Sequence, residues 1–220
     1  MMKKTRATLA ALLCTSALML GACSNDNDGD TKAQETTTVK YDSADDKSLV
    51  RDMNGQEVDR SDAANANVSP EDMNQISDAG ESFIIDSVGL NVPLGTLTSY
   101  NGVIEPVNYT SAFVVADYSP GYVNSEDGSV IVVAHALDGA GKAPGNYVVD
   151  PNTGAPLANI GDRIVVGSKT YEITDQRSIL KDEIPNSDLV WAEEPGVMHF
   201  ITCVPHRNEN LVITAKEVVE

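Results

Sequence analysis

Val130-Ile131-Val132-Val133-Ala134-His135 is the strongest structural signal in the sequence, because five apolar residues in a row end at a histidine. Three valines and an isoleucine favour extended backbone, and the run has the length of a strand rather than of a helix. We expect this segment to be a buried central strand, with His135 at its C-terminal end.

Similar short apolar runs occur on both sides of this segment, with turn residues between them. They cover residues 82–85, 90–94, 112–115, 163–166, 169–173, 197–202 and 211–218. Gly167-Ser168 separates two of the runs as a β-hairpin turn would, since glycine readily adopts a positive φ. Helical periodicity is scarce, and only residues 186–191 suggest a short turn of helix. The pattern predicts one all-β domain over residues 81–220, either a closed barrel or a sandwich.

The first 80 residues have a different composition. Basic residues near the start precede an apolar stretch that ends Leu20-Gly21-Ala22-Cys23 and resembles the lipobox of a bacterial lipoprotein. We therefore expect a signal peptide over residues 1–22 and a lipid on Cys23, which would anchor the protein at the extracytoplasmic face of the cell membrane. Residues 23–80 are acidic and poor in aliphatic side chains, so we expect them to form a disordered tether.

The protein is strongly acidic, with a formal net charge of −18. Nucleic acids and anionic lipid surfaces repel a protein of this charge, so neither is expected as a partner. The charge itself carries little information about the fold.

Cys203 ends the apolar run 197–202 as His135 ends its own run, and it is the one cysteine in the predicted domain. Without a partner for an intrachain disulfide, a lone thiol is either an inert core residue or a nucleophile. A nearby imidazole favours the thiolate and can then protonate a leaving amine, but spacing along the chain does not show whether the two residues touch. His199, Cys203 and His206 fall short of the four ligands of a structural zinc site, so no metal is expected.

Two motifs and their order resemble those of the sortases. Ser129-Val130-Ile131-Val132-Val133-Ala134-His135 is similar to the sortase strand that ends in the catalytic histidine, and Phe200-Ile201-Thr202-Cys203 is similar to the strand that ends in the nucleophile. The separation between His135 and Cys203 along the chain fits that of the two catalytic residues in sortases. Residues 159–164 and 181–185, which lie between the two motifs, are also similar to sortase segments. The resemblance covers residues 81–218 and points to a class E/F-like actinobacterial sortase domain on a bacterial lipoprotein. It implies a closed eight-stranded β-barrel with short helical turns.

The resemblance also implies roles for individual residues. Cys203 would be the nucleophile that forms the acyl-thioester, and His135 would be the general acid and base. Sortases carry an arginine at the start of the last strand, where this sequence has Asn210, while Arg207 precedes it in the connecting loop. We expect Arg207 to donate hydrogen bonds to the substrate and to the oxyanion, with Asn210 as the alternative donor.

By the same resemblance, the chain is expected to be a cysteine transpeptidase that needs no cofactor. It would cleave an LPXTG-like sorting signal and transfer the acyl group to an amine of a cell-wall precursor or a pilin. Two alternatives remain open. One is a catalytically degenerate sortase-fold lipoprotein that acts as a binding module, and the other is a thiol hydrolase that releases the acyl group to water.

Overall fold

The structure is a computed structural model that describes residues 49–60 and 68–219. Its main feature is a set of β-strands that pair to form a closed barrel. All of the described residues belong to one compact unit, Tyr41–Glu220. The strands are β1 (Leu49–Arg51), β2 (Glu57–Asp59), β3 (Ile76–Ile85), β4 (Leu90–Leu97), β5 (Ala112–Val115), β6 (Val130–Val133), β7 (Arg163–Val166), β8 (Lys169–Leu180), β9 (Val197–Cys203) and β10 (Glu209–Glu217). The helical elements are α1 (Asp188–Trp191) and the 3-10 turns η1 (Asp86–Val88), η2 (Ala116–Tyr118), η3 (Pro120–Tyr122), η4 (Ser125–Asp127), η5 (Pro144–Tyr147) and η6 (Ile184–Asn186).

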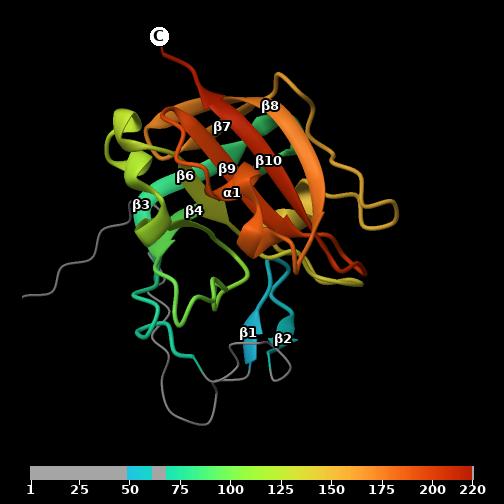
Figure 1. The fold of residues 1–220 in the computed structure, drawn as a ribbon. Coiled ribbons are helices and arrows are strands. Elements are labelled where there is room, and N and C mark those ends of the chain that lie inside the picture. The colour runs from blue at the N-terminus through green and yellow to red at the C-terminus, as the bar shows by residue number, and fades with distance from the viewer. Residues whose placement is uncertain (1–48, 61–67, 220) are drawn as a thin grey trace, which may run out of the picture. The chain divides into compact units, whose positions relative to one another are not determined.

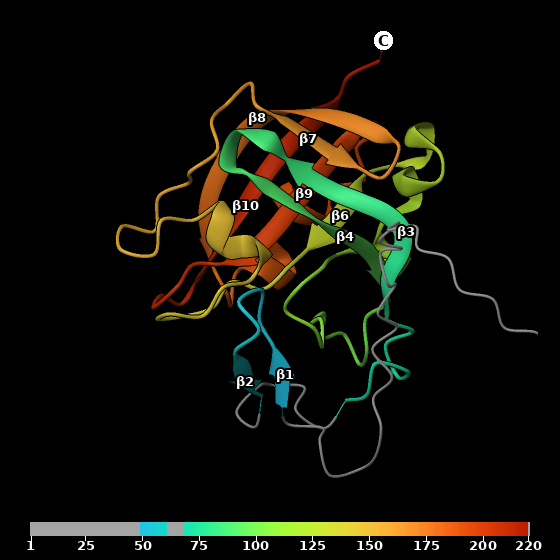
Figure 2. The same ribbon diagram turned by 180° about the vertical axis from the view of Figure 1, so that it is seen from behind.

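Eight of these strands form a closed barrel in the order β10-β8-β7-β3-β4-β5-β6-β9. The pairs β4–β5 and β6–β9 are parallel, and the other neighbours are antiparallel. Figure 1 shows β9 and β10 on the near side of the barrel with α1 in front of them, and the reverse view in Figure 2 shows β3 and β4 on the opposite side. The prediction of an all-β, closed eight-stranded barrel with short helical turns is confirmed.

Apolar side chains fill the barrel and also cover part of its outer surface. Inside, the rings of Phe83 and Phe200 lie 4.8 Å apart between their centroids, within a cluster of buried residues from all eight strands. A second apolar cluster joins the outward side chains of Ile131 and Ile201 to Val190 of α1. Every residue of β6 is therefore buried, which explains why its sequence is continuously apolar rather than alternating.

Ordered structure begins earlier in the chain than residue 81. The predicted signal peptide and Cys23 lie outside the described residues, and so does most of the predicted tether over 23–80. Within the described part of that tether, β1 and β2 form an antiparallel pair and β3 already begins at Ile76. Neither 49–60 nor 68–219 contains a helix that is long and apolar enough to cross a membrane.

Candidate active site

The pairing of two parallel strands brings His135 and Cys203 to neighbouring positions. Val133 of β6 lies opposite Ile201 of β9, and the ladder continues with a 3.3 Å hydrogen bond from the Ala134 N–H to the Ile201 carbonyl. Two residues further along each strand are His135 and Cys203. Side chains two residues apart point to the same face, and paired strands are about 4.8 Å apart. The register therefore brings His135 and Cys203 to neighbouring backbone positions, with both side chains on the outer face of the barrel.

The imidazole of His135 is held by a backbone carbonyl and by an aromatic ring. Its Nε2 lies 2.6 Å from the carbonyl oxygen of Pro106, and its ring stacks on Tyr109 with the centroids 4.2 Å apart. A carbonyl only accepts hydrogen bonds, so Nε2 carries a proton and Nδ1 is the nitrogen with a free lone pair. Burial lowers the pKa of His135 to about 4; the bond to Pro106 opposes this shift, and the positive charge of Arg60 adds to it. At neutral pH the ring is an uncharged base.

The thiol of Cys203 is free and half-buried. Burial raises its pKa, and the negative charges of Glu105 and Asp138 act in the same direction. Lys181 opposes them through its charge and a side-chain hydrogen bond to the thiol. At neutral pH the site therefore holds a neutral thiol and a neutral imidazole, with the ammonium group of Lys181 next to the sulfur.

Asn210 shares this site, because it lies directly opposite Cys203 in the antiparallel pair of β9 and β10. Residues that face each other across such a pair project to the same side of the sheet. The side chain of Asn210 lines a cavity of about 890 Å³, together with Lys181, Ile201 and Trp191. The walls of the cavity are mainly apolar, and the cavity extends from the Cys203 end of β9 towards α1. An extended apolar segment of a ligand can therefore lie in the cavity, whose lining includes Asn210 and Lys181, two neighbours of Cys203.

Arg207 points in a different direction from Asn210. Its Nη2 donates a 2.6 Å hydrogen bond to the carbonyl oxygen of Thr153, and its Nη1 lies 3.8 Å from a carboxylate oxygen of Glu209. The guanidinium thus contacts the loop that contains Thr153, whereas Asn210 is the residue that lines the cavity.

Arg60 is a residue of this site that the sequence did not suggest. It follows directly after β2, only 1% of its surface is exposed, and its side chain hydrogen-bonds to Tyr109. Its charge acts on both Tyr109 and His135. No local pattern distinguishes this arginine, because it lies in a polar segment that lacks any apolar periodicity.

The remaining histidines do not form a metal centre with Cys203. The Nδ1 of buried His199 lies 3.1 Å from the hydroxyl of Thr214, and the backbone N–H of His206 donates a 2.7 Å bond to Asp138. Across the described ranges, no group of three or more His, Cys, Asp and Glu side chains is placed to hold a metal ion.

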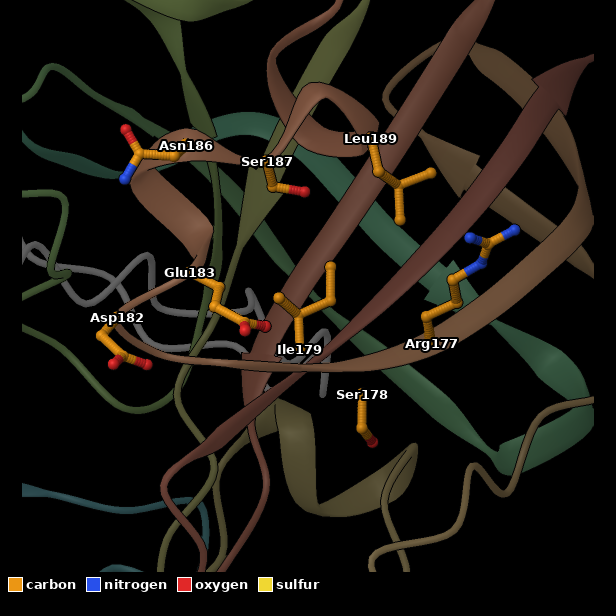
Figure 3. Close-up of a pocket in the computed structure, with 8 residues that line it drawn as sticks. All are labelled: Arg177, Ser178, Ile179, Asp182, Glu183, Asn186, Ser187 and Leu189. Atoms are coloured by element: carbon orange, nitrogen blue, oxygen red, sulfur yellow. The ribbon is translucent and has the colours of Figure 1, made fainter.

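A second, shallower cavity of about 500 Å³ lies beside the segment that joins β8 to α1 (Figure 3). Ile179 and Leu189 are the apolar residues in its lining, and Arg177, Asp182 and Glu183 are the charged ones. It includes neither the thiol nor the imidazole, so it is separate from the site at Cys203.

No family model matches the sequence, and no curated protein matches it. Among solved structures the chain is similar to sortase A from Corynebacterium diphtheriae, with 16% identity over 63% of this chain and 60% of that one and a TM-score of 0.47. Sortase C1 from Streptococcus agalactiae is 16% identical over 64% of this chain and 67% of its own, with a TM-score of 0.48. Sortase C-1 from Actinomyces oris is 17% identical over 64% and 72%, with a TM-score of 0.47. The chain spans less than two thirds of the length of the Corynebacterium enzyme.

Proposed function

We propose that this protein is a sortase-type cysteine transpeptidase. The observation that supports the proposal is the register of β6 and β9, which runs to Val133 opposite Ile201 and so brings the following His135 and Cys203 to neighbouring backbone positions. A mainly apolar cavity lined by Asn210 and Lys181 lies next to them. A lone cysteine in an apolar strand is usually inert. A cysteine next to a histidine with a free Nδ1 and beside a ligand-sized cavity has the components of a nucleophilic site.

The uncharged state of both groups suggests the order of the proton transfers. As the Cys203 sulfur bonds to the carbonyl carbon of a peptide, its proton moves to Nδ1 of His135 and the carbonyl π electrons move to the oxygen. When this pair re-forms the carbonyl, the carbon–nitrogen bond breaks and the leaving amine takes the proton from His135. A second amine then attacks the thioester, gives its proton to His135 and displaces the sulfur, which recovers a proton as the thiol.

The cavity supports an extended peptide as the acyl donor. Ile131, Val133, Ile201 and Trp191 present apolar surface along its length, which suits a short segment with branched aliphatic side chains. An LPXTG-like sorting signal has this character, with its scissile carbonyl placed at Cys203. The acceptor in the proposal is an amine of a cell-wall precursor or of a pilin, and no cofactor takes part.

We also propose that the domain acts outside the cell, held to the membrane by a lipid on Cys23. The support is the Leu20-Gly21-Ala22-Cys23 segment after a basic and apolar leader. Such an anchor would hold the site on the side of the membrane where cell-wall precursors and surface proteins meet. Metabolic labelling with an alkyne fatty acid tests the anchor, because Cys23→Ala should abolish the label and a label that remains would exclude this site.

The test of the reaction is mass spectrometry of the purified protein after incubation with sorting-signal peptides. The wild type should form an acyl adduct on Cys203, Cys203→Ala should form none, and His135→Gln should form it far more slowly. His206→Asn is the matched control, because this exposed histidine has a left-handed backbone that asparagine tolerates.

The products with and without an amine acceptor separate the three candidate functions. A new amide in the presence of the amine supports the transpeptidase, whereas release of the free acid alone supports the thiol hydrolase. Peptide that binds without an adduct, together with a thiol no more reactive than a model thiol, would mean a binding module and would refute the proposal.

A further inference from the structure

The β1–β2 hairpin is attached to the barrel through one buried carboxylate. Asp52 is only 3% exposed and accepts 2.8 Å hydrogen bonds from the backbone N–H groups of Asn54, Gln56 and Lys142. The N–H of Met53 also donates a 2.8 Å bond to the carbonyl of Lys142. The first two bonds shape the turn of the hairpin, and the bonds to Lys142 tie that turn to the loop that follows β6.

This attachment positions Arg60, which directly follows β2, next to the candidate active site. Its side chain hydrogen-bonds to Tyr109, and the Tyr109 ring stacks directly on His135. Arg60 and Cys203 both lie within electrostatic range of the Tyr109 hydroxyl, on which the guanidinium and a Cys203 thiolate would act in opposite directions. Arg60 thus lies on the imidazole side of the site, whereas Lys181 lies beside the sulfur.

The guanidinium of Arg60 has donors that the described residues leave unused. Its Nε and Nη2 are fully buried and have no hydrogen-bond partner there. A buried donor without a partner is unfavourable, and more so when it carries charge. Nε and a terminal nitrogen of arginine form a planar fork that matches the two oxygens of a carboxylate or a single oxyanion. A buried arginine with two free donors on one edge can therefore bind an acidic oxygen of a ligand.

We propose that Arg60 is the cationic hydrogen-bond donor of this active site, and that its free Nε and Nη2 bind the oxygen of the acyl group that Cys203 attacks. The inference rests on the proposed function and adds to it a catalytic residue from outside the barrel. It also makes the N-terminal hairpin a part of the active site. Asn210, across the strand pair from Cys203, is then a neutral donor on the other side of the reacting carbon.

Alkylation of Cys203 tests this assignment without any peptide substrate. Iodoacetate and iodoacetamide differ by one carboxylate, so the ratio of their rate constants reports a cation that binds acidic oxygens beside the thiol. Lys181 contributes equally in each variant and cancels from the comparison. Arg60→Gln should lower the iodoacetate-to-iodoacetamide ratio about tenfold or more, since a charge-assisted bond is lost. Arg60→Lys should retain most of the ratio.

Arg51→Gln is the matched control, because it removes the same charge from the same hairpin. The Arg51 guanidinium is exposed and is paired with Glu57, so its loss should leave the ratio unchanged. Arg60→Met is made beside Arg60→Gln, and circular dichroism shows which neutral replacement keeps the wild-type fold. An unchanged ratio in a folded neutral variant, or an equal fall in Arg51→Gln, overturns the assignment.

Peptide turnover supplies the second readout and separates this inference from the function on which it rests. If the wild type transfers acyl groups, Arg60→Gln should lower kcat about 100- to 1000-fold, as expected for the loss of an oxyanion donor. Turnover within threefold of wild type would refute the role of Arg60 and leave the transpeptidase intact. If the wild type forms no acyl adduct, the proposed function fails, and the alkylation ratio still decides whether Arg60 binds an acidic oxygen beside Cys203.

Discussion

Protonation of His135 should destabilise the folded protein well above the pH at which carboxylates titrate. The pKa of its imidazole is about 4 in the folded chain, against an ordinary value of 6.5, because burial penalises the charged ring. Between these two values the unfolded chain binds a proton that the folded chain does not. The free energy of unfolding therefore rises with pH across this window and falls as the pH drops through it.

The size of the effect follows from the two pKa values. A shift from 6.5 to about 4 removes about 2 kcal/mol from the free energy of unfolding between pH 7.5 and pH 5, and about 3 kcal/mol once the folded form is also protonated. For a folded unit of this size, 2 kcal/mol corresponds to a fall of roughly 4–8 °C in Tm. His199, whose pKa burial also lowers, adds to the loss in the same direction.

Urea denaturation at pH 7.5 and pH 5 measures this loss, and His135→Gln isolates the part that comes from His135. Three aspartates with lowered pKa values, Asp52, Asp150 and Asp162, stay ionised at pH 5 in either state, so they do not distort the comparison. The wild type should lose about 2 kcal/mol more than His135→Gln. An equal loss of unfolding free energy in the two proteins would show that the imidazole is not held in a buried, neutral state. That result would also refute the proposed order of proton transfers.

Three further changes probe the surroundings of the site. Lys181→Met should raise the pKa of Cys203 further, so alkylation of the thiol by iodoacetamide at pH 7.5 should slow by roughly threefold to tenfold; an unchanged pH–rate profile would contradict the contact. Asp52→Ala removes the acceptor of three backbone N–H groups, so hydrogen exchange should speed up in the hairpin while the strands of the barrel stay protected. Gly145→Ala places a methyl group against the hydroxyl of Thr202 and should destabilise the protein by about 1–3 kcal/mol. A Tm equal to that of the wild type would mean that this backbone has room to move.

The sequence predicted best the strands that are buried on both faces. The run at residues 130–134 became β6, and the run at residues 197–202 became β9, because nearly every side chain in them is removed from water. The turn at Gly167 has a φ of +60° and joins β7 to β8, as its composition suggested. A strand that is buried on both faces has a continuously apolar sequence, so it can be recognised without the structure.

The elements that the sequence missed are held by other forces. The hairpin of β1 and β2 is attached through Asp52 and backbone groups, and it buries few aliphatic side chains. The first residues of β3 are exposed and are held by pairing, with Ile76 opposite Thr96 of β4. Because these segments are polar, the sequence suggested a disordered tether. Hydrophobic periodicity reveals elements with an apolar face, but it does not reveal a hairpin held by a buried carboxylate.

The site was predictable only where its chemistry coincided with a strand end. His135 and Cys203 each end an apolar run, but they become neighbours only because β6 pairs with β9, although β7 and β8 lie between them in the sequence. Whether Arg207 or Asn210 lines the cavity depends on the direction of each side chain, which cannot be predicted from the spacing of residues along the sequence. The position of Arg60 near His135 could not be predicted, because nothing in the sequence around residue 60 links it to the end of a strand that begins 70 residues later.

In the reaction we propose, the uncharged resting state gives cations near the thiol and the imidazole their importance. Burial raises the pKa of Cys203 and lowers that of His135, so the ground state contains no ion pair for a nearby charge to stabilise. Negative charge develops only when the sulfur attacks and the carbonyl oxygen takes the electron pair. A cation fixed beside that oxygen then stabilises the transition state far more than the resting enzyme, which is the condition for lowering the barrier. In the reaction we propose, Lys181 is the cation on the sulfur side, and Arg60 is the cation on the imidazole side while Asp52 keeps the hairpin attached. Release of the hairpin should therefore lower kcat without preventing alkylation of Cys203, and Asp52→Ala measured in both assays would reveal that difference.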